Sequence, residues 1–240
     1  MIRQHLDTAP VWAAYRTDCE CPLCLLQAQS EASYVENFLG GSVMEPAVRI
    51  EVNEKGFCRR HLDLLYGAGN RLGLALMAHT HMQEMIRQLE NAPSPAGSRT
   101  RWGKQPSPPP AMAQRCILCD RLENAMARYE ETLLYMWRTE SAFRDAFSQS
   151  KGLCLPHYQR LASRCAEALR GRELEDFAQA LRQVTLDNLR RVEADLNWFT
   201  LKFDYRNRDK PWGSSRDAVE RALIKLRGGV ASSQEGAEAP

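Results

Sequence analysis

Residues 21–24 read CPLC and residues 55–61 read KGFCRRH, and the same two patterns return as CILC at 116–119 and KGLCLPH at 151–157. The first pattern recurs at an offset of 95 residues and the second at an offset of 96. Each copy thus contains Cys-x2-Cys followed by Gly-x-Cys-x2-His. Because four residues of metal-ligand type repeat nearly in register, the sequence indicates a tandem duplication of one unit.

The repeated residues are of the types that bind zinc. A structural Zn²⁺ takes four ligands in a tetrahedron, and three thiolates with one imidazole are a common set. We therefore predict two zinc ions, each in a Cys3His site, with iron–sulfur clusters as the alternative because clusters prefer thiolates. The predicted ligands are Cys21, Cys24, Cys58 and His61 in the first copy and Cys116, Cys119, Cys154 and His157 in the second.

The spacing is compatible with two pairings of these ligands. Each copy can close its own site, or the Cys-x2-Cys of one copy can share an ion with the Cys-x2-His of the other. Pairing within a copy closes the shorter loop and costs less chain entropy, so we expect each copy to hold its own site.

Two further features of the repeated motif carry structural expectations. Gly56 and Gly152 suit a turn with positive φ or a close backbone approach to the metal. The cysteine that follows is expected at a helix start, where the helix dipole favours a thiolate. Nearby cations are expected to offset the charge of −1 that three thiolates and a divalent ion leave: Lys55, Arg59, Arg60, Arg115, Arg121 and Lys151.

The remaining sequence predicts an all-α fold. Apolar residues recur at steps of three and four over 77–89 and 174–203, and only 48–52 offers a weak strand candidate. Pro, Ser and Gly dominate residues 91–111, which contain no acidic residue. We divide the chain into a first metal-binding helical repeat (1–91), a Pro-rich basic linker (92–113), a second metal-binding repeat with an aromatic and basic extension and a final helix (114–227), and a disordered tail (228–240).

Composition narrows the classes of protein that remain. The 240 residues carry 32 basic and 30 acidic side chains, a balance that argues against a protein dominated by phosphate binding. No secretory signal and no run of 18 apolar residues is present, so we expect a cytoplasmic protein without a membrane partner. In that reducing compartment, spaced cysteines point to metal or redox chemistry rather than to disulfides.

Cysteines and histidines outside the motif are interpreted individually. Cys19 has no counterpart in the second copy, and of a redox thiol, an alternate ligand and an incidental cysteine we favour the last. Cys165 is expected in the core because it shares a helical face with apolar neighbours. His79 and His81 are two positions apart on a predicted helix, so they do not readily bind one ion together.

The C-terminal region interleaves aromatic and basic side chains. Such a cluster can stack on nucleic-acid bases or cover the end of the helical core, and we favour the packing interpretation. A final helix is expected over 215–226, capped by Ser214 or Ser215. The cluster comprises Trp198, Phe199, Phe203, Tyr205 and Trp212 around Arg206, Arg208 and Lys210.

The paired motifs, CPLC with GFCRRH and CILC with GLCLPH, resemble those of a bacterial and archaeal family described as a domain of unknown function. The stretch FDYRNRDKPWG at 203–213, followed by DAVERA at 217–222, is similar to that family's C-terminal segment. The resemblance covers about residues 15–228. It implies a cytoplasmic, helical, cysteine-rich protein and brings no activity with it.

These observations favour a binding protein over an enzyme. We expect a zinc-binding interaction or regulatory module with a protein partner. The alternatives are an iron–sulfur electron-transfer protein and a nucleic-acid-binding zinc protein. The linker charge of +4 over 93–115 favours nucleic-acid binding, and the charge of −3 over 1–92 argues against it. Catalysis has the least support, since no phosphate loop, nucleophile elbow or His-Glu-x-x-His motif is present.

Overall fold

The structure, a computed structural model, describes residues 2–92 and 116–230, with side chains from residue 7 onward. All regular structure in these residues is helical, as predicted, and the strand candidate at 48–52 lies inside a helix. Most of the linker and tail predicted from the sequence fall outside the described residues. The α-helices are α1 (Ile2–Arg16), α2 (Pro22–Leu39), α3 (Pro46–Lys55), α4 (Arg59–Gly67), α5 (Arg71–Asn91), α6 (Ile117–Thr139), α7 (Ser141–Gln149), α8 (Leu155–Ala168), α9 (Gly171–Leu201) and α10 (Ala218–Arg227).

The chain forms two compact units. The first comprises Met1–Gln29 together with Ala125–Pro240, and the second comprises Ser30–Asn124. Helices α2 and α6 therefore contribute residues to both units. The boundaries of these units differ from those of the two predicted repeats, 1–91 and 114–227, and the tandem duplication stays a prediction.

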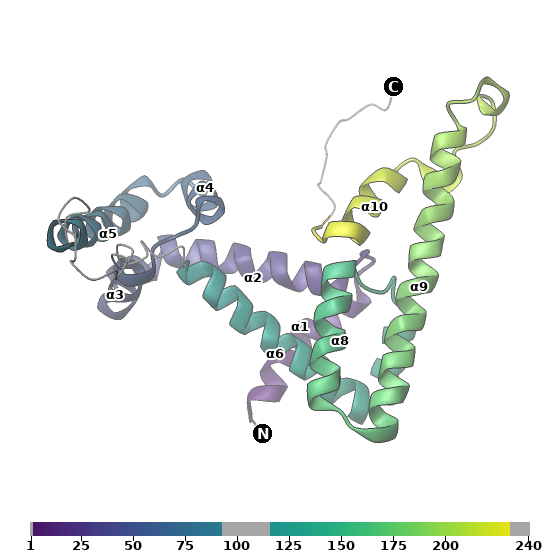
Figure 1. Ribbon diagram of the computed structural model, residues 1–240, viewed down its shortest axis with the longest axis horizontal. Helices are drawn as coiled ribbons and strands as arrows, with labels where there is room; N and C mark the ends of the chain where they lie inside the picture. The colour runs from purple at the N-terminus through teal and green to yellow at the C-terminus, as the bar shows by residue number, and fades with distance from the viewer. Residues whose placement is uncertain (1, 93–115, 231–240) are drawn as a thin grey trace, which may run out of the picture. The chain divides into compact units, whose positions relative to one another are not determined.

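The first unit packs around aromatic side chains of α7 and α9. Phe143, Phe147 and Phe177 are fully buried, and Leu23 and Leu26 from the first turns of α2 lie in the same cluster. Burying each such side chain contributes about 1.5–3 kcal/mol. Helix α9 buries its apolar stripe here, and α10 lies against α8 and α9 (Figure 1).

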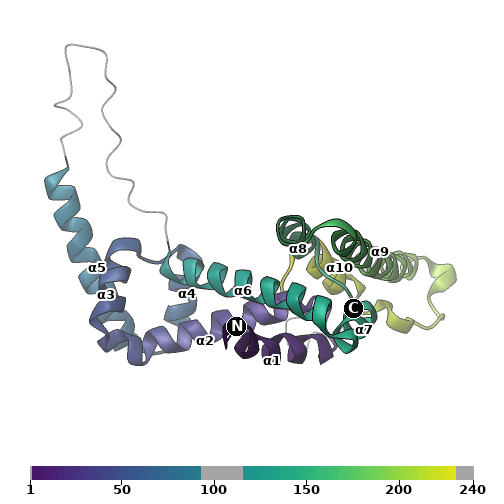
Figure 2. The same ribbon diagram turned by 90° about the horizontal axis from the view of Figure 1, so that it is seen from below.

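The second unit has its own smaller core. Phe38 of α2, Val52 of α3 and Met77 of α5 are fully buried, and α3 packs along α5 (Figure 2). Ile117 and Leu118, which directly precede Cys119 at the start of α6, are buried in the same cluster. The first turn of α6 therefore belongs to this core.

Three aromatic residues at the end of α9 and in the loop that follows contact one another, but Phe203 is 69% exposed, so the interpretation that the cluster covers the core stays a prediction. The Phe199 ring lies 5.5 Å from the Phe203 ring and 5.6 Å from the Trp212 ring between centroids. Lys202 Nζ donates hydrogen bonds to the carbonyls of Asn207, Arg208 and Lys210, which closes the loop. Tyr205 is not part of this cluster and is 84% exposed.

The last helix begins later than predicted. Residues 213–215 form a 3₁₀ turn, in which the Ser215 hydroxyl donates to the Trp212 carbonyl, so neither Ser214 nor Ser215 occupies the N-cap position of α10. Helix α10 begins at Ala218 after Asp217. Among the described residues, none of the helices combines the length and apolar character that a membrane span requires.

Candidate metal centres

Each Cys-x2-Cys motif lies at the start of a long helix. Cys21 directly precedes α2, and Pro22 occupies its first position, where a missing backbone N–H costs nothing. Cys116 precedes α6 in the same way. The second cysteine of each motif, Cys24 or Cys119, lies in the first helical turn, so both thiols of a pair lie at one helix end.

The Gly-x-Cys-x2-His motif has nearly the same backbone in both copies. Gly56 and Gly152 have φ of +64° and +71°, as predicted for the turn. Cys58 and Cys154 are the N-cap residues of α4 and α8, with φ of −71° in both, which confirms the predicted helix start. The histidine is the third residue of its helix.

Close approach explains why glycine is needed here, but the approach is to a neighbouring helix and not to the metal ligands. A Cβ on Gly152 would lie 2.9 Å from the backbone oxygen of Val184. A Cβ on Gly56 would lie 2.6 Å from Nε2 of His81.

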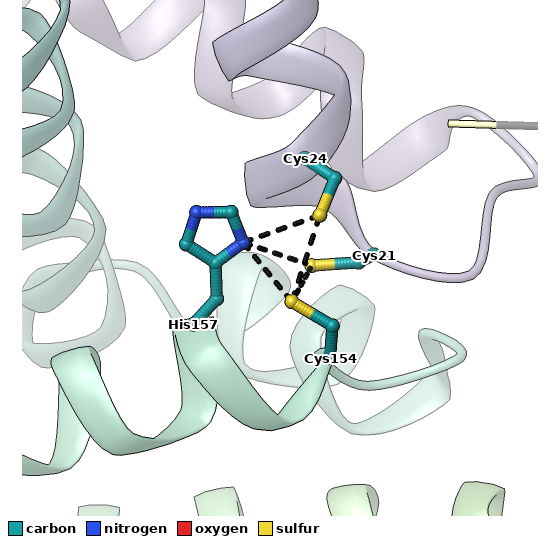
Figure 3. A group of neighbouring side chains, drawn as sticks. All are labelled: Cys21, Cys24, Cys154 and His157. Carbon is teal, nitrogen blue, oxygen red and sulfur yellow. Dashed lines mark hydrogen bonds between the residues drawn. The ribbon is translucent and has the colours of Figure 1, made fainter. Parts of the chain in front are cut away.

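The eight predicted ligands form two clusters, and the pairing crosses between the copies. Cys21 and Cys24 meet Cys154 and His157, which we name the first-unit centre (Figure 3). Cys58 and His61 meet Cys116 and Cys119, which we name the second-unit centre. The expected pairing within each copy is therefore wrong. The physical reason is that the helix start carrying each Cys-x2-Cys is buried in the core against which the cysteine of the other copy's Gly-x-Cys-x2-His motif packs.

In the first-unit centre, His157 directs Nδ1 at all three sulfurs. The Nδ1–Sγ distances are 3.2 Å to Cys154, 3.3 Å to Cys24 and 3.5 Å to Cys21. The Sγ of Cys154 lies 3.5 Å from that of Cys24 and 3.7 Å from that of Cys21. Four donor atoms thus face one point (Figure 3).

The second-unit centre has the same shape. Nδ1 of His61 lies 3.2 Å from the sulfurs of Cys58 and Cys116 and 3.4 Å from that of Cys119. The sulfurs of Cys58 and Cys119 are 3.8 Å apart. In each centre the donor atoms all lie within 4.8 Å of one another.

These distances match the edges of a zinc tetrahedron. With Zn–S of about 2.3 Å and Zn–N of about 2.0 Å, tetrahedral angles place two sulfurs about 3.8 Å apart and sulfur and nitrogen about 3.6 Å apart. The two centres approach both edge lengths to within a few tenths of an ångström. Each set of side chains can therefore hold one metal ion.

Electrostatics in the first-unit centre favour a thiolate that a cation can bind. Burial opposes charge on Cys21, but hydrogen bonds with Cys154, Cys24 and His157 lower its pKa well below the ordinary value. Burial also opposes charge on His157, yet hydrogen bonds with Cys154 and Cys21 raise its pKa to about 10. Without an ion the cluster therefore stores negative charge on sulfur and balances it with a proton on the imidazole.

The surroundings of the first-unit centre include a buried lysine that the sequence analysis missed. Lys225 of α10 is 1% exposed, and its Nζ donates to the carbonyl of Glu20, the residue before Cys21, and to that of Lys151. It also lies 3.2 Å from the Glu20 carboxylate, which pairs with Arg191 at 2.6 Å. Just beyond α10, the backbone N–H of Gly229 donates to Cys24 Sγ at 3.3 Å.

The second-unit centre is supported by a carboxylate. Nε2 of His61 lies 3.0 Å from Glu31, whose other oxygen accepts from Arg60 at 2.6 Å. A carboxylate on the distal nitrogen orients a metal-binding histidine and raises its basicity. The backbone N–H of Ile117 donates to the Gly56 carbonyl at 3.1 Å, which holds the α6 start beside this motif.

Most of the cations expected to balance the centres instead form ion pairs with acidic side chains. Lys55 pairs with Asp120, Arg59 with Asp63, Arg121 with Glu51 and Lys151 with Asp18, while Arg115 lies outside the described residues. The lysine that does lie beside a centre, Lys225, could have been suspected from sequence. It shares one helical face with Ala218 and Ala222, where an apolar residue is expected.

The other cysteines and histidines lie outside the two clusters. Cys165 is buried in the first core, as predicted. Cys19 is partly buried beside a surface cavity, and burial raises the pKa of its thiol to about 11. Nδ1 of His81 lies 3.0 Å from the Asn53 carbonyl oxygen, so this histidine has a packing role.

Comparison with known proteins shows which family the chain belongs to. The chain is 21% identical over 187 residues to the "Uncharacterized 23.9 kDa protein in xynA 3'region" of Caldicellulosiruptor sp. (strain Rt8B.4), which covers 78% of this chain and 84% of the relative. No solved structure matches the chain. The model of a family of unknown function, DUF6062, matches residues 2–233. The chain therefore belongs to the DUF6062 family, as the resemblance of its paired motifs predicted.

Proposed function

We propose that the protein binds two zinc ions, one in each centre, and that both ions are structural. The observation that carries this proposal is the arrangement of three sulfurs and one nitrogen at the edge lengths of a zinc tetrahedron, twice in one chain. Each ion would join parts of the chain that are far apart in sequence, since Cys24 and Cys154 are separated by 130 positions. Such links contribute directly to folding stability.

The sulfur positions support a single ion in each centre over an iron–sulfur cluster. In a 4Fe–4S cluster each ligand binds a different iron, and in a 2Fe–2S cluster the four ligands divide between two irons, so the four ligand atoms cannot all lie as close together as around one ion. Sulfur–sulfur distances of 3.5–3.8 Å fit ligands of one ion. A single iron ion fits the same tetrahedron, and elemental analysis distinguishes it from zinc.

A structural role is supported by the complete ligand sets. Catalytic zinc keeps one coordination position for water or substrate, whereas both centres fill all four positions with protein side chains. All eight cysteines lie in the described residues and all are free thiols. This state suits a reducing compartment, and we propose a cytoplasmic interaction or regulatory module.

Metal analysis of the purified protein tests the proposal. We expect two equivalents of zinc per chain by elemental mass spectrometry and no visible absorption after purification without air. Cys165→Ser should retain both equivalents, whereas Cys154→Ser and Cys116→Ser should each retain one. A protein that holds iron, or that binds no zinc when zinc is supplied under reducing conditions, would contradict the proposal.

A further inference from the structure

The two centres have identical ligand types but different access to solvent. All four ligands of the first-unit centre are buried, and Cys154 is completely so. In the second-unit centre, His61 and Cys116 are buried, but Cys58 and Cys119 reach solvent. A small oxidant or chelator can therefore contact two sulfurs of one centre and none of the other.

Hydrogen bonding adds to the difference. Gly228 and Gly229 follow α10 across the first-unit centre, so that a Cβ on Gly228 would lie 3.5 Å from Cys24 Sγ and 3.6 Å from Cys154 Sγ. The Gly229 N–H bonded to Cys24 withdraws electron density from that sulfur. The neighbouring Lys225 supplies a positive charge.

The second-unit centre has the opposite electrostatic support. Nε2 of its His61 contacts the Glu31 carboxylate, which makes the ligand set more electron-rich. A more electron-rich, accessible thiolate reacts faster with electrophiles. Solvent access and electrostatics both indicate that the thiolates of the second-unit centre react faster with electrophiles than those of the first-unit centre.

We propose that the second-unit centre is a peroxide-sensitive zinc site, in which oxidation of Cys58 and Cys119 to a disulfide releases its zinc while the first-unit centre keeps its own. This proposal rests on the proposed function, because it requires zinc in both centres. It assigns a regulatory role to one centre and a purely structural role to the other.

The chemistry balances with hydrogen peroxide as the oxidant. The Cys119 thiolate attacks one peroxide oxygen, the O–O bond breaks, and a sulfenic acid and hydroxide form. The Cys58 thiolate, 3.8 Å away, attacks the sulfenic sulfur and displaces a second hydroxide as the S–S bond forms. Two electrons leave the sulfurs, two protons from solvent convert the hydroxides to water, and Zn²⁺ departs after losing two of its four ligands.

Zinc release would act on a defined part of the second unit. The ion joins the α4 start, which carries Cys58 and His61, to the α6 start, which carries Cys116 and Cys119. After oxidation, the Cys58–Cys119 disulfide joins the two helix starts in place of the ion, while His61 and Cys116 lose their metal link. The backbone hydrogen bond from Ile117 to Gly56, the buried Ile117 and Leu118, and the ion pairs of Asp120 and Arg121 also hold the α6 start. A dithiol reductant and zinc would reverse the change.

The test is a peroxide titration of the intact protein loaded with two zinc ions. A chromogenic chelator reports zinc release over time, and peptide mass spectrometry identifies the disulfide. We expect one equivalent to leave at least tenfold faster than the second, together with a Cys58–Cys119 disulfide. Release of both equivalents at one rate, or a disulfide among Cys21, Cys24 and Cys154 first, would overturn the inference.

Two variants make the assignment specific. Cys119→His keeps four ligands but removes one of the two reacting thiols, so the protein should still bind two zinc ions and lose the fast phase. Cys19→Ser removes the partly buried thiol outside the clusters and should leave the fast phase unchanged. If the fast phase disappears in Cys19→Ser, or persists in Cys119→His with two zinc ions bound, the inference is wrong. A wild-type protein that never binds two zinc ions would instead refute the proposed function.

Discussion

Substitution of His157 by alanine tests the crossed pairing of the ligands. The change removes the nitrogen that lies 3.2–3.5 Å from three sulfurs of the first-unit centre. We expect zinc to be lost from that centre, and Cys21 and Cys24 to become reactive although they lie more than 130 positions away in sequence. Cys116 should stay protected, because His61 completes its centre.

The expected magnitude follows from the coordination. Structural zinc in a small site contributes about 10–16 kcal/mol, so one of four ligands accounts for roughly 3 kcal/mol. Since each 1.4 kcal/mol changes an equilibrium constant by about tenfold, the zinc affinity of the first-unit centre should fall about a hundredfold. A chelator of intermediate affinity would then remove zinc from this centre and leave the other loaded.

The assay is alkylation of the native protein in the presence of that chelator, followed by peptide mapping. Cys116 is the reporter for the second-unit centre, because it is buried whereas Cys119 is accessible. Cys165→Ser is the control, since it removes a buried cysteine that belongs to neither cluster. Local unfolding around His157 should not change the labelling of Cys116, because the two centres lie in different units with separate cores.

The opposite labelling pattern would refute the crossed pairing. If His157→Ala exposes Cys116 and leaves Cys21 and Cys24 protected, then each copy closes its own site. If the variant keeps both zinc equivalents in the presence of the chelator, as measured by elemental mass spectrometry, His157 is not a ligand.

Three further predictions concern single residues. Gly152→Ala should lower the free energy of unfolding in urea by about 2–4 kcal/mol, because φ is +71° and its Cβ would meet the Val184 backbone, whereas Gly171→Ala, with φ of +56° and open space, should cost only about 1 kcal/mol; equal losses would contradict this. Glu31→Gln should weaken zinc binding about tenfold in the second-unit centre alone, measured by chelator competition, because it removes the carboxylate from His61. Glu130 is fully buried and pairs with Arg160 and Arg164, so Glu130→Gln, which leaves both arginines facing a neutral side chain, should lower the free energy of unfolding by about 3 kcal/mol, and a loss below about 1 kcal/mol would show that the burial of its charge offsets the pairing.

Local features of the fold could be predicted because they depend on a few neighbouring residues. The positive φ of Gly56 and Gly152 and the helix starts at Cys58 and Cys154 follow from glycine's freedom and from capping geometry. The buried stripe of α9 follows from spacing at three and four positions. The ligand identities belong to the same class of inference, since residue type and spacing determine them.

The surroundings of the centres could not be predicted in this way. Lys225 reaches the Glu20 carbonyl across 205 positions, and Gly229 reaches Cys24 across the same separation. Neither contact can be predicted from the spacing of residues in the sequence, because both depend on how α10 packs against α8 and α9. The predicted cap at Ser214 or Ser215 is wrong for a related reason: residues 213–215 form a 3₁₀ turn, and α10 begins only at Ala218, after Asp217.

The pairing of ligands shows how small the entropy argument is beside packing. Closing a loop of 130 positions between Cys24 and Cys154, instead of 34 between Cys24 and Cys58, costs only about 1 kcal/mol more, since the cost grows with the logarithm of length. Burying Leu23 and Leu26 in the first core contributes about 3–6 kcal/mol, which exceeds that cost. Loop length therefore predicted the wrong pairing, because the apolar residues beside the cysteines determine the core in which each Cys-x2-Cys lies. The cysteines then meet the histidine of the motif whose cysteine packs in the same core.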